Sequence, residues 1–450
     1  MITELKKIEI AQWLLDPDKQ RIVPDDLKEL DSELKNRGLE KIYREIELPL
    51  VPILEEMQAV GIKVDGAVLD RLARTLVGEL GQLEKQIYDS AGGPFNINSP
   101  KQLSEVLYDR LKIDIKGIPR RKTGARSTDV EALTKIKDYH PVVPLILRYR
   151  ELFKVYSTYV MPLKELALAS KDGRIHTEFL QTSAATGRLA SQNPNLQNIP
   201  IMSEWGKKIR EAFVAEKGFS LLALDYSQIE LRVLASVAGD KAMIQAFQQG
   251  QDIHKLTASK VFNVPIEKVI SEQRQLAKTL NFGVIYGMGP DALARNTGMS
   301  REEAEGFISE YFSDFAEVKR WQEKTIEQAR RVGYVENLNG RKRWLPAIGS
   351  ANRRFAGEAE RAGINMPIQS LAADIIKLAM IKVADYLKKE KLWMKQARLL
   401  LSIHDELLFE IADDILKEVQ PKLEEIMESA YLLAVALKTD AAMGKNWGAL

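Results

Sequence analysis

The stretch FSLLALDYSQIELRVLA, residues 219–235, contains the pattern that decides the fold. Its apolar run from Leu221 to Leu224 has the length and composition of a buried strand, and Asp225 closes it. Ile229, Leu231 and Val233 then follow at the spacing of a helix. The pattern therefore predicts a carboxylate at the end of a buried strand, where it opens onto a cleft.

A second stretch, RLLLSIHDELLFEIA at residues 398–412, repeats this arrangement. Its two apolar runs flank His404, Asp405 and Glu406, which predicts a tight hairpin. A carboxylate beside so much apolar surface is costly unless a cation or hydrogen bonds compensate it. Magnesium prefers oxygen ligands and commonly uses one or two protein carboxylates together with substrate phosphates. Taken singly, Asp225 is also interpretable as a helix cap and Asp405 as a turn residue.

A third stretch, SEQRQLAKTLNFGVIYGMG at residues 271–289, predicts a helix with a stripe of functional side chains. Arg274, Lys278, Phe282 and Tyr286 recur at every fourth residue, so they lie along one slowly winding face. The two cations suit a triphosphate, and the aromatic rings offer a flat face for a base or sugar. His254 is a further candidate donor. Ordinary helix packing of the aromatics and a capping role for His254 remain the alternatives.

Composition limits the class of protein. A chain of 450 residues exceeds the usual size of a single core, so we expect several subdomains. The 65 basic and 63 acidic residues nearly balance, so any basic surface is local. The absence of cysteine excludes disulfides, thiolate-bound zinc and cysteine nucleophiles. We find no signal peptide and no charge-free membrane span, which predicts a cytoplasmic protein.

The chain divides by pattern into a short charged beginning and a longer helical and mixed part. Apolar spacing predicts helices from Glu45 to about Val60 and from Val68 to about Leu83. Between Lys101 and Arg126, eight basic residues face three acidic ones, and the part from Lys112 to Arg126 predicts a loop. A solvated linker and a contact with phosphates are equally good interpretations of that loop.

Three of these motifs together resemble those of the family A DNA polymerases, in that family's order: DYSQIELR (225–232), RQLAKTLNFGVIYG (274–287) and HDE (404–406). TGRLASQNPNLQNIP (186–200) and ERAGINMPIQSLAADIIK (360–377) extend the resemblance. It implies a helix-rich α/β (α+β) fold shaped as a right hand, with an antiparallel sheet in the palm. The implied parts are a leader or remnant of an exonuclease domain (1–45), the thumb and the approach to the palm (46–185), the palm (186–245 and 346–450) and the fingers (246–345).

The resemblance also implies the chemistry of the site. Asp225 and Asp405 would bind two magnesium ions, with the Tyr226 carbonyl assisting and Glu406 nearby; manganese is the expected substitute. The reaction would add deoxynucleoside triphosphates to a primer 3′-OH with release of pyrophosphate. Lys278 would give a proton to the leaving group.

The implied nucleotide site gathers residues from several segments. Arg274, Lys278 and His254 would hold the phosphates, Phe282 would stack on the nucleotide, and Tyr286 would sit where the templating base enters. Gln228 belongs to the same site. Glu230 resembles a steric gate against ribonucleotides that hydrogen-bonds toward Tyr286. Phe282 in place of tyrosine predicts that dideoxynucleotides are disfavoured.

The implied partner is primer–template DNA, bound by a monomer. Minor-groove acceptors are nearly the same for all base pairs, so contacts there sense pairing without reading sequence. The residues that match the family's minor-groove and primer contacts are Arg188, Gln197, Asn198, Arg361, Asn365, Gln369 and His404. The basic loop matches the tip of the thumb. With only about 45 residues before the thumb, we expect neither a proofreading nor a flap nuclease.

Two other functions are compatible with these motifs. A reverse transcriptase or RNA polymerase shares this chemistry; the Glu230 gate argues against RNA synthesis but leaves an RNA template open. A catalytically silent DNA-binding subunit is the other, although such a protein has little need of every acid and phosphate ligand.

Overall fold

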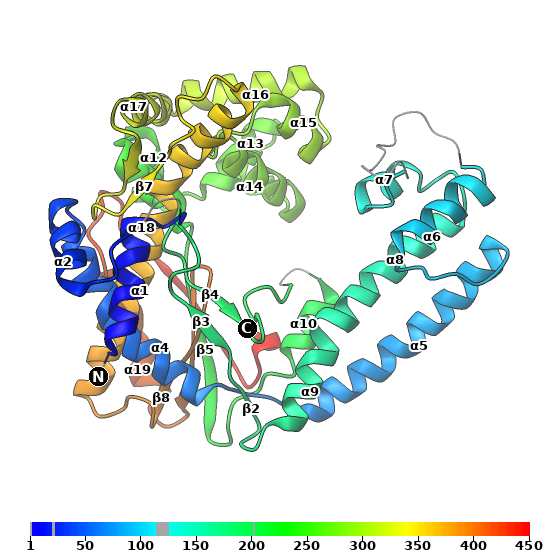
Figure 1. Ribbon diagram of the computed structural model, residues 1–450, viewed down its shortest axis with the longest axis horizontal. Helices are drawn as coiled ribbons and strands as arrows, with labels where there is room; N and C mark the ends of the chain where they lie inside the picture. The colour runs from blue at the N-terminus through cyan, green and yellow to red at the C-terminus, as the bar shows by residue number, and fades with distance from the viewer. Residues whose placement is uncertain (1, 20–22, 114–125, 201–202) are drawn as a thin grey trace. The chain divides into compact units, whose positions relative to one another are not determined.

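The computed structural model describes the whole chain except residues 1, 20–22, 114–125 and 201–202 (Figure 1). The chain forms two compact units, each built from segments distant in sequence. The first comprises Met1–Gly61, His176–Gln197 and Lys217–Gly444. The second comprises Ile62–Ile175, Asn198–Glu216 and Lys445–Leu450.

A four-stranded antiparallel sheet lies at the centre of the first unit. Its strand order is β10 (Thr439–Gly444), β5 (Phe219–Tyr226), β9 (Glu406–Ala412) and β8 (Ala397–Ile403). Residues 220–224 of β5 are all buried, and helix α19 (Leu416–Glu428) packs on this strand. The predicted strand ending near Asp225 and the predicted hairpin around His404 to Glu406 are both present.

The rest of the first unit is mainly helical. Its remaining helices are α1 (Glu4–Leu15), α2 (Leu27–Asn36), α3 (Glu40–Ile42), η1 (Tyr43–Glu47), α4 (Leu48–Val60), α11 (Ile229–Ala238), α12 (Lys241–Gln248), α13 (Ile253–Val261), η4 (Ile266–Lys268), α14 (Ser271–Ile285), α15 (Pro290–Thr297), α16 (Arg301–Asp314), α17 (Ala316–Val332) and α18 (Arg353–Lys389). Two small antiparallel pairs join β3 (Glu178–Leu180) to β4 (Ala190–Gln192) and β6 (Tyr334–Glu336) to β7 (Lys342–Trp344).

The first 45 residues contain more structure than their charged composition suggested. Thr3 caps α1 by accepting a hydrogen bond from the Lys6 N–H, and the helix buries Ile10, Trp13 and Leu14. These side chains form an apolar cluster with residues of α2, α3, η1 and α4. The charged residues cover the outside of this cluster, so composition alone concealed its core.

Helix α18 is the longest apolar element in the part of the chain that the structure describes. By length and composition it is the one described helix that is able to cross a membrane, but 78% of its apolar window is buried inside the protein. It packs against α4, α11, α17 and α19. It is therefore a core helix, not a signal sequence. The sequence analysis, which noted no charge-free span, had not identified this stretch.

The second unit consists mostly of helices. They are α5 (Gly66–Ala91), α6 (Pro100–Ser104), η2 (Glu105–Arg110), α7 (Val130–Lys135), α8 (Val142–Val155), η3 (Tyr156–Val160), α9 (Met161–Ala169), α10 (Glu204–Arg210) and η5 (Trp447–Ala449), with a short pair of strands β1 (Ile62–Lys63) and β2 (Arg174–Ile175).

Helix α5 extends beyond both ends of the predicted run from Val68 to Leu83. Asp65 caps its start by accepting from the N–H groups of Ala67 and Val68, and Gly92, with φ +75°, ends it in the left-handed region. The apolar face of α5 packs on α8. The basic loop predicted for Lys112 to Arg126 lies mostly outside the described residues; at its end, the Arg126 guanidinium lies 5.2 Å from the Tyr108 ring centre.

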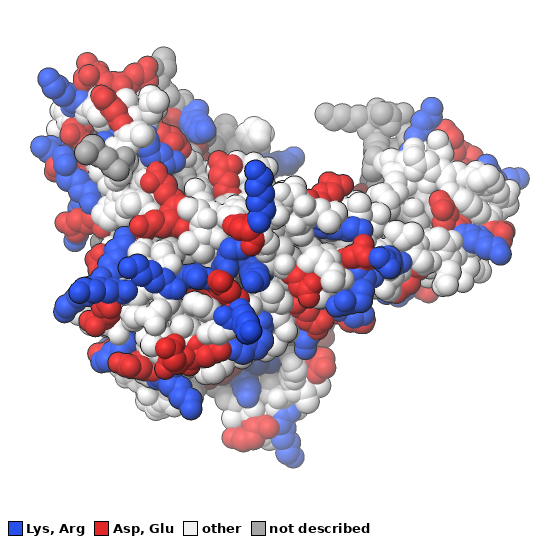
Figure 2. Space-filling model, turned by 90° about the horizontal axis from the view of Figure 1, so that it is seen from below, with Lys and Arg blue, Asp and Glu red and all other residues white. Residues whose placement is uncertain are grey.

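The surface matches the balanced charge of the sequence. On the face that Figure 2 presents, Lys and Arg side chains are interspersed with Asp and Glu side chains. The helix-rich α+β class with antiparallel sheets is confirmed.

Candidate active site

The sheet brings together two acids that are about 180 residues apart in the sequence. The Tyr226 N–H donates to the Asp405 main-chain carbonyl at 3.1 Å. In the same register Asp225 of β5 lies opposite Glu406 of β9. His404, with φ +52°, makes the sharp turn that places Asp405 between the two strands. The predicted meeting of these acids is therefore a consequence of antiparallel pairing.

A third carboxylate joins them that the sequence analysis missed. Asp440 of β10 lies opposite Asp225 on the other side of β5. Directly opposed residues in antiparallel strands point to the same face of the sheet, so the side chains of Asp440, Asp225 and Glu406 form a row across three strands. The sequence around Asp440, TDAAMG, carries no apolar run that marks it as a neighbour of β5.

This concentration of acids opposes ionisation. Removal of water by the surrounding protein, followed by repulsion from Asp405, Glu406 and Asp440, raises the pKa of Asp225 to about 7. Solvent still reaches the Asp225 side chain, so an ion has access to it. Burial also raises the pKa of Asp405, although Arg188, His404 and Lys278 oppose the shift.

The donor set fits a hard divalent cation. Carboxylate and carbonyl oxygens gather here, and the nearby cations offset their negative charge only in part, so a magnesium ion would stabilise the ionised acids. Among the residues that the structure describes, no three His, Asp or Glu side chains converge as a closed metal cage. Two carboxylates and a carbonyl leave coordination positions that magnesium commonly fills with water and substrate oxygens.

Helix α14 presents the predicted stripe. Lys278, Phe282 and Tyr286 line one pocket together with Arg361 of α18. The Phe282 and Tyr286 rings stack with their centres 5.7 Å apart. The helix itself ends at Ile285, so Tyr286 occupies the C-cap position rather than a helical turn. Two cations, Lys278 and Arg361, and two aromatic rings thus border this pocket, whereas Arg274 of the predicted stripe does not line it.

His254 lies beside this stripe. Its Nδ1 is 2.9 Å from the Asn281 amide nitrogen, and its ring centre is 5.6 Å from that of Phe282. Arg274 approaches from the same side and donates from Nε to Asp252 at 2.7 Å. Burial, assisted by the cations Arg274 and Lys278, lowers the pKa of His254 to about 4. At neutral pH this histidine is therefore an uncharged hydrogen-bonding group.

Glu230 has a different partner from the expected one. Its carboxylate forms a close ion pair with Arg188, whereas the buried Tyr286 hydroxyl has no hydrogen-bond partner among the described residues. The expected hydrogen bond from Glu230 toward Tyr286 is thus absent from this structure. Burial, together with repulsion from Asp405, raises the pKa of Glu230 to about 7, although Arg188 and Lys278 oppose the shift.

The remaining candidates fall into three groups. Arg188, Gln197 and His404 line one small cavity, in which the Gln197 amide donates to the Ser402 carbonyl at 2.9 Å. Two amides, those of Gln228 before α11 and Asn365 on α18, each have a buried oxygen with no partner among the described residues.

The third group contains Gln369 and Asn198. Gln369 lies half-buried farther along α18. Asn198 belongs to the second unit, where its carbonyl accepts from the Tyr159 hydroxyl at 2.8 Å.

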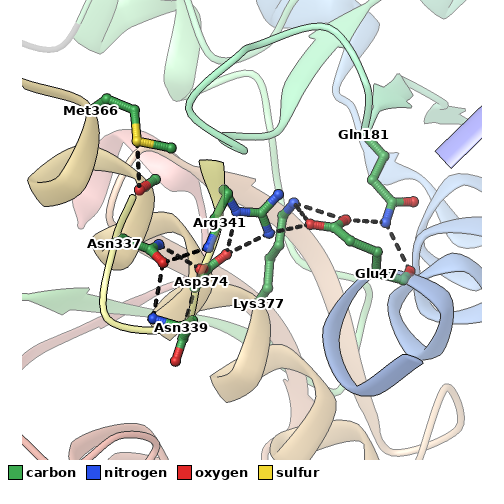
Figure 3. A network of polar contacts seen from close by, with 9 residues as sticks. Glu47, Gln181, Asn337, Asn339, Arg341, Met366, Asp374 and Lys377 are labelled. Atoms are coloured by element: carbon green, nitrogen blue, oxygen red, sulfur yellow. Dashed lines mark hydrogen bonds and ion pairs between the residues drawn. The ribbon is translucent and has the colours of Figure 1, made fainter. Parts of the chain in front are cut away.

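A buried charged network was not anticipated at all (Figure 3). Glu47, Arg341, Asp374 and Lys377 are each at most 2% exposed and interact with one another. Asp374 and Lys377 lie on α18, whereas Glu47 belongs to η1 and Arg341 to the turn before β7. Nothing in the sequence indicated the network, because these three segments meet only in the folded chain.

Comparison with known proteins adds an independent observation. The sequence pattern of DNA polymerase family A matches residues 66–449. The chain is 46% identical over 421 residues to the thermostable DNA polymerase I of Thermus thermophilus, which covers 94% of this chain and 49% of the relative. It is 44% identical over 437 residues to DNA polymerase I of Deinococcus radiodurans, with 97% and 45% covered. The chain thus spans about half the length of the curated relatives it matches.

A solved structure is also similar. The POL domain of Pol1 from M. smegmatis, in complex with DNA primer-template and dNTP, superposes with a TM-score of 0.91 at 36% identity. The match covers 98% of this chain and 82% of that one.

Proposed function

Since this chain belongs to DNA polymerase family A, we propose that it extends a primer by template-directed transfer of deoxynucleotides. The primer 3′-OH attacks the α-phosphorus of a paired deoxynucleoside triphosphate, the bond to the β-phosphate breaks, and pyrophosphate leaves. Such a displacement needs positioning and charge stabilisation more than covalent catalysis. The observation that carries the proposal is that Asp225 and Asp405 meet where the inner strands β5 and β9 pair at their ends.

Asp225 and Asp405 would hold two magnesium ions, with the Tyr226 carbonyl as a further ligand and manganese as an alternative. When bound, the ions lower the pKa of the attacking hydroxyl and neutralise charge on the leaving group. The sheet's contribution is to hold the carboxylates in fixed positions. The Tyr226 hydroxyl donates to the Met427 carbonyl at 2.6 Å, so this side chain anchors the end of β5 while its carbonyl stays beside Asp225.

Helix α14 would bind the triphosphate. Lys278 and Arg274 hold its phosphates as cations, and Lys278 gives a proton to the departing pyrophosphate. His254 contributes a hydrogen bond without charge, as its low pKa requires. Phe282 stacks on the nucleotide and Tyr286 lies where the template base enters. Closure of α14 around a correct pair would complete the site and supply selectivity.

Glu230 would exclude ribonucleotides by its bulk near the sugar. Gln228 lies beside it in the same site. Arg188, Gln197, Asn198, Arg361, Asn365, Gln369 and His404 would follow the minor groove and the primer end. Their side chains offer hydrogen bonds that a correctly paired duplex accepts regardless of sequence.

The chain would form the palm and fingers of a right hand, with a thumb before them. The proposed palm (186–245 and 346–450) contains all four strands of the central sheet, and the proposed fingers (246–345) contain α14. The proposed thumb and its approach to the palm (46–185) include residues 62–175 of the second unit. The partners would be primer–template DNA and deoxynucleoside triphosphates, bound by a monomer in the cytoplasm of a bacterium or, for a viral protein, of its host.

The metal assignment is tested by removing the acids while keeping their shape. Asp225→Asn and Asp405→Asn should each lower primer extension at least about 100-fold, because cation stabilisation contributes several kcal/mol, while DNA binding changes little. Asp413→Asn is the matched control, since Asp413 accepts from Ser220 at 2.6 Å at the far end of the same sheet. Substantial extension by either site variant contradicts the assignment.

The rival functions differ in template and nucleotide. Extension assays that cross DNA and RNA templates with deoxy- and ribonucleotides separate a DNA polymerase from a reverse transcriptase or an RNA polymerase. We expect deoxynucleotide addition on a DNA template and leave the RNA template open. Magnesium-independent DNA binding with no extension on any template would favour a catalytically silent DNA-binding subunit.

A further inference from the structure

The buried charged network connects segments from across the first unit. The Arg341 guanidinium donates to Asp374 from Nε at 2.9 Å and from Nη2 at 2.6 Å, and Nη2 also reaches Glu47. The Lys377 ammonium contacts both Glu47 oxygens, at 2.8 and 3.0 Å. Asn337 and Asn339 satisfy the second oxygen of Asp374. Figure 3 shows Arg341 and Lys377 between the two acids.

Burial acts against the charges of this network, and it lowers the pKa of Lys377. Burial disfavours the charged form of Glu47, but Lys377 and Arg341 outweigh it and lower the pKa of Glu47 below its usual value. Trp13 covers both cations, with its ring centre 5.3 Å from the Arg341 Cζ and from the Lys377 Nζ. Desolvated ion pairs of this kind often add no net stability over apolar side chains of the same volume. Stability alone is therefore a poor explanation for this cluster.

A second observation connects the network to the candidate active site. Gly187 has φ +82°, and a Cβ built on it lies 3.0 Å from both Cζ and Nε of Arg341. The Arg341 guanidinium is thus packed directly against the Gly187 backbone. The next residue, Arg188, forms the ion pair with Glu230. Lys377 lines the same cavity as Arg188, Gln197 and His404.

We propose that Arg341, held by Glu47 and Asp374, is a positioning residue that fixes the Gly187 backbone and so keeps Arg188 on the steric gate Glu230. This inference rests on the proposed function, because the role of Glu230 belongs to it. The guanidinium is planar and rigid. Its N–H groups bind Glu47 and Asp374, and it also packs against Gly187. Without the Arg341 guanidinium, the loop that carries Arg188 can shift, and Glu230 then loses its ion-pair partner.

The test compares two arginines that lie two positions apart. Arg341→Lys keeps the charge but removes the planar fork that contacts Gly187. Arg343→Lys is the matched control, because Arg343 is 25% exposed and pairs with Asp18 from Nε at 3.0 Å, away from the network. Single-nucleotide insertion gives kcat/KM for a deoxy- and a ribonucleotide, and a thermal melt gives the stability of each variant.

We expect Arg341→Lys to lower the deoxy-to-ribo ratio of kcat/KM at least about tenfold, or about 1.4 kcal/mol, and Arg343→Lys to leave it unchanged. In an Arg188→Ala background, Arg341→Lys should have no further effect on the ratio, because both act through one contact. An unchanged ratio in folded Arg341→Lys, or an additive loss in the double variant, overturns the proposal.

Gly187→Ala tests the same contact from the other side. The added methyl group meets the guanidinium at a positive φ, so it displaces the loop without altering any charge. It should also lower the deoxy-to-ribo ratio, and it keeps the proposal testable where Arg341→Lys does not fold; an unchanged ratio again overturns it. If the parent protein adds no deoxynucleotide, the proposed function is refuted. This result differs from an unchanged ratio in the variants, which refutes only the positioning role of Arg341.

Discussion

Glu230 is a buried carboxylate whose ionisation the protein opposes. Its pKa is raised to about 7, so in the folded state it keeps a proton that the unfolded chain has already lost above about pH 4.5. Stability contributed by this group is therefore lost as the pH rises from about 4.5 to about 7. We expect Glu230→Gln to flatten this part of the stability curve, with a change of up to about 3 kcal/mol.

The measurement is urea unfolding of the parent and of Glu230→Gln at several pH values between 4.5 and 8. The parent should lose stability relative to the variant across that window. Equal slopes for the two proteins would show that Arg188 compensates the charge fully.

Two cations on one face of α14 should have separable effects. Arg274→Met should raise the KM for the nucleotide about 10- to 100-fold, because a hydrogen bond to a charged group contributes about 1.5–3 kcal/mol. Lys278→Met should lower kcat by more than it raises KM, since a proton donor acts in the transition state. Steady-state insertion kinetics measure both. Lys255→Met, at an exposed position of α13, is the control and should change neither.

At the level of elements, close approach of backbones decides where glycine is required. A Cβ built on Gly206 of α10 lies 1.8 Å from the Pro200 carbonyl oxygen. Gly206→Ala should therefore destabilise the second unit by more than about 2 kcal/mol, although alanine is the better helix former. Thermal and urea unfolding report the change.

The matched control is Gly81→Ala on α5, where no atom lies within 4 Å of the added methyl group. This substitution should stabilise the helix by up to about 1 kcal/mol. A stable Gly206→Ala variant would mean that α10 moves away from Pro200 at little cost.

At the scale of the whole molecule, the last residues of the chain complete a unit that begins near its start. Trp447 is 1% exposed; its ring centre lies 5.5 Å from that of Phe213 and 4.2 Å from the Arg210 Cζ. Trp447→Ala should cost about 3–5 kcal/mol and make the second unit susceptible to limited proteolysis. Leu432→Ala, at a side chain that is 94% exposed, should have no effect. Equal digestion of both variants would contradict this view of the unit.

Local sequence patterns were sufficient to predict those parts of the candidate site that consist of residues close together in the sequence. The acids that end β5 and the β8–β9 turn were marked by the apolar runs beside them, and the four-residue spacing on α14 fixed its stripe. The family resemblance suggested the partners of these motifs, and family membership confirms that resemblance. Asp440, the Arg188 partner of Glu230 and the Glu47–Arg341 network had no such mark, because each depends on a contact between distant segments.

The strand, hairpin and helix that carry the candidate site were predictable from the sequence, because hydrophobic periodicity and turn chemistry are local properties of the chain. The way in which the acids meet depends on the folded chain, because the strand register sets Asp225 between Glu406 and Asp440. It also revealed a core among the first 45 residues and charges buried beside Gly187. The sequence gives the type of a charged residue but not whether its side chain faces water or a distant partner. That environment is set by tertiary contacts.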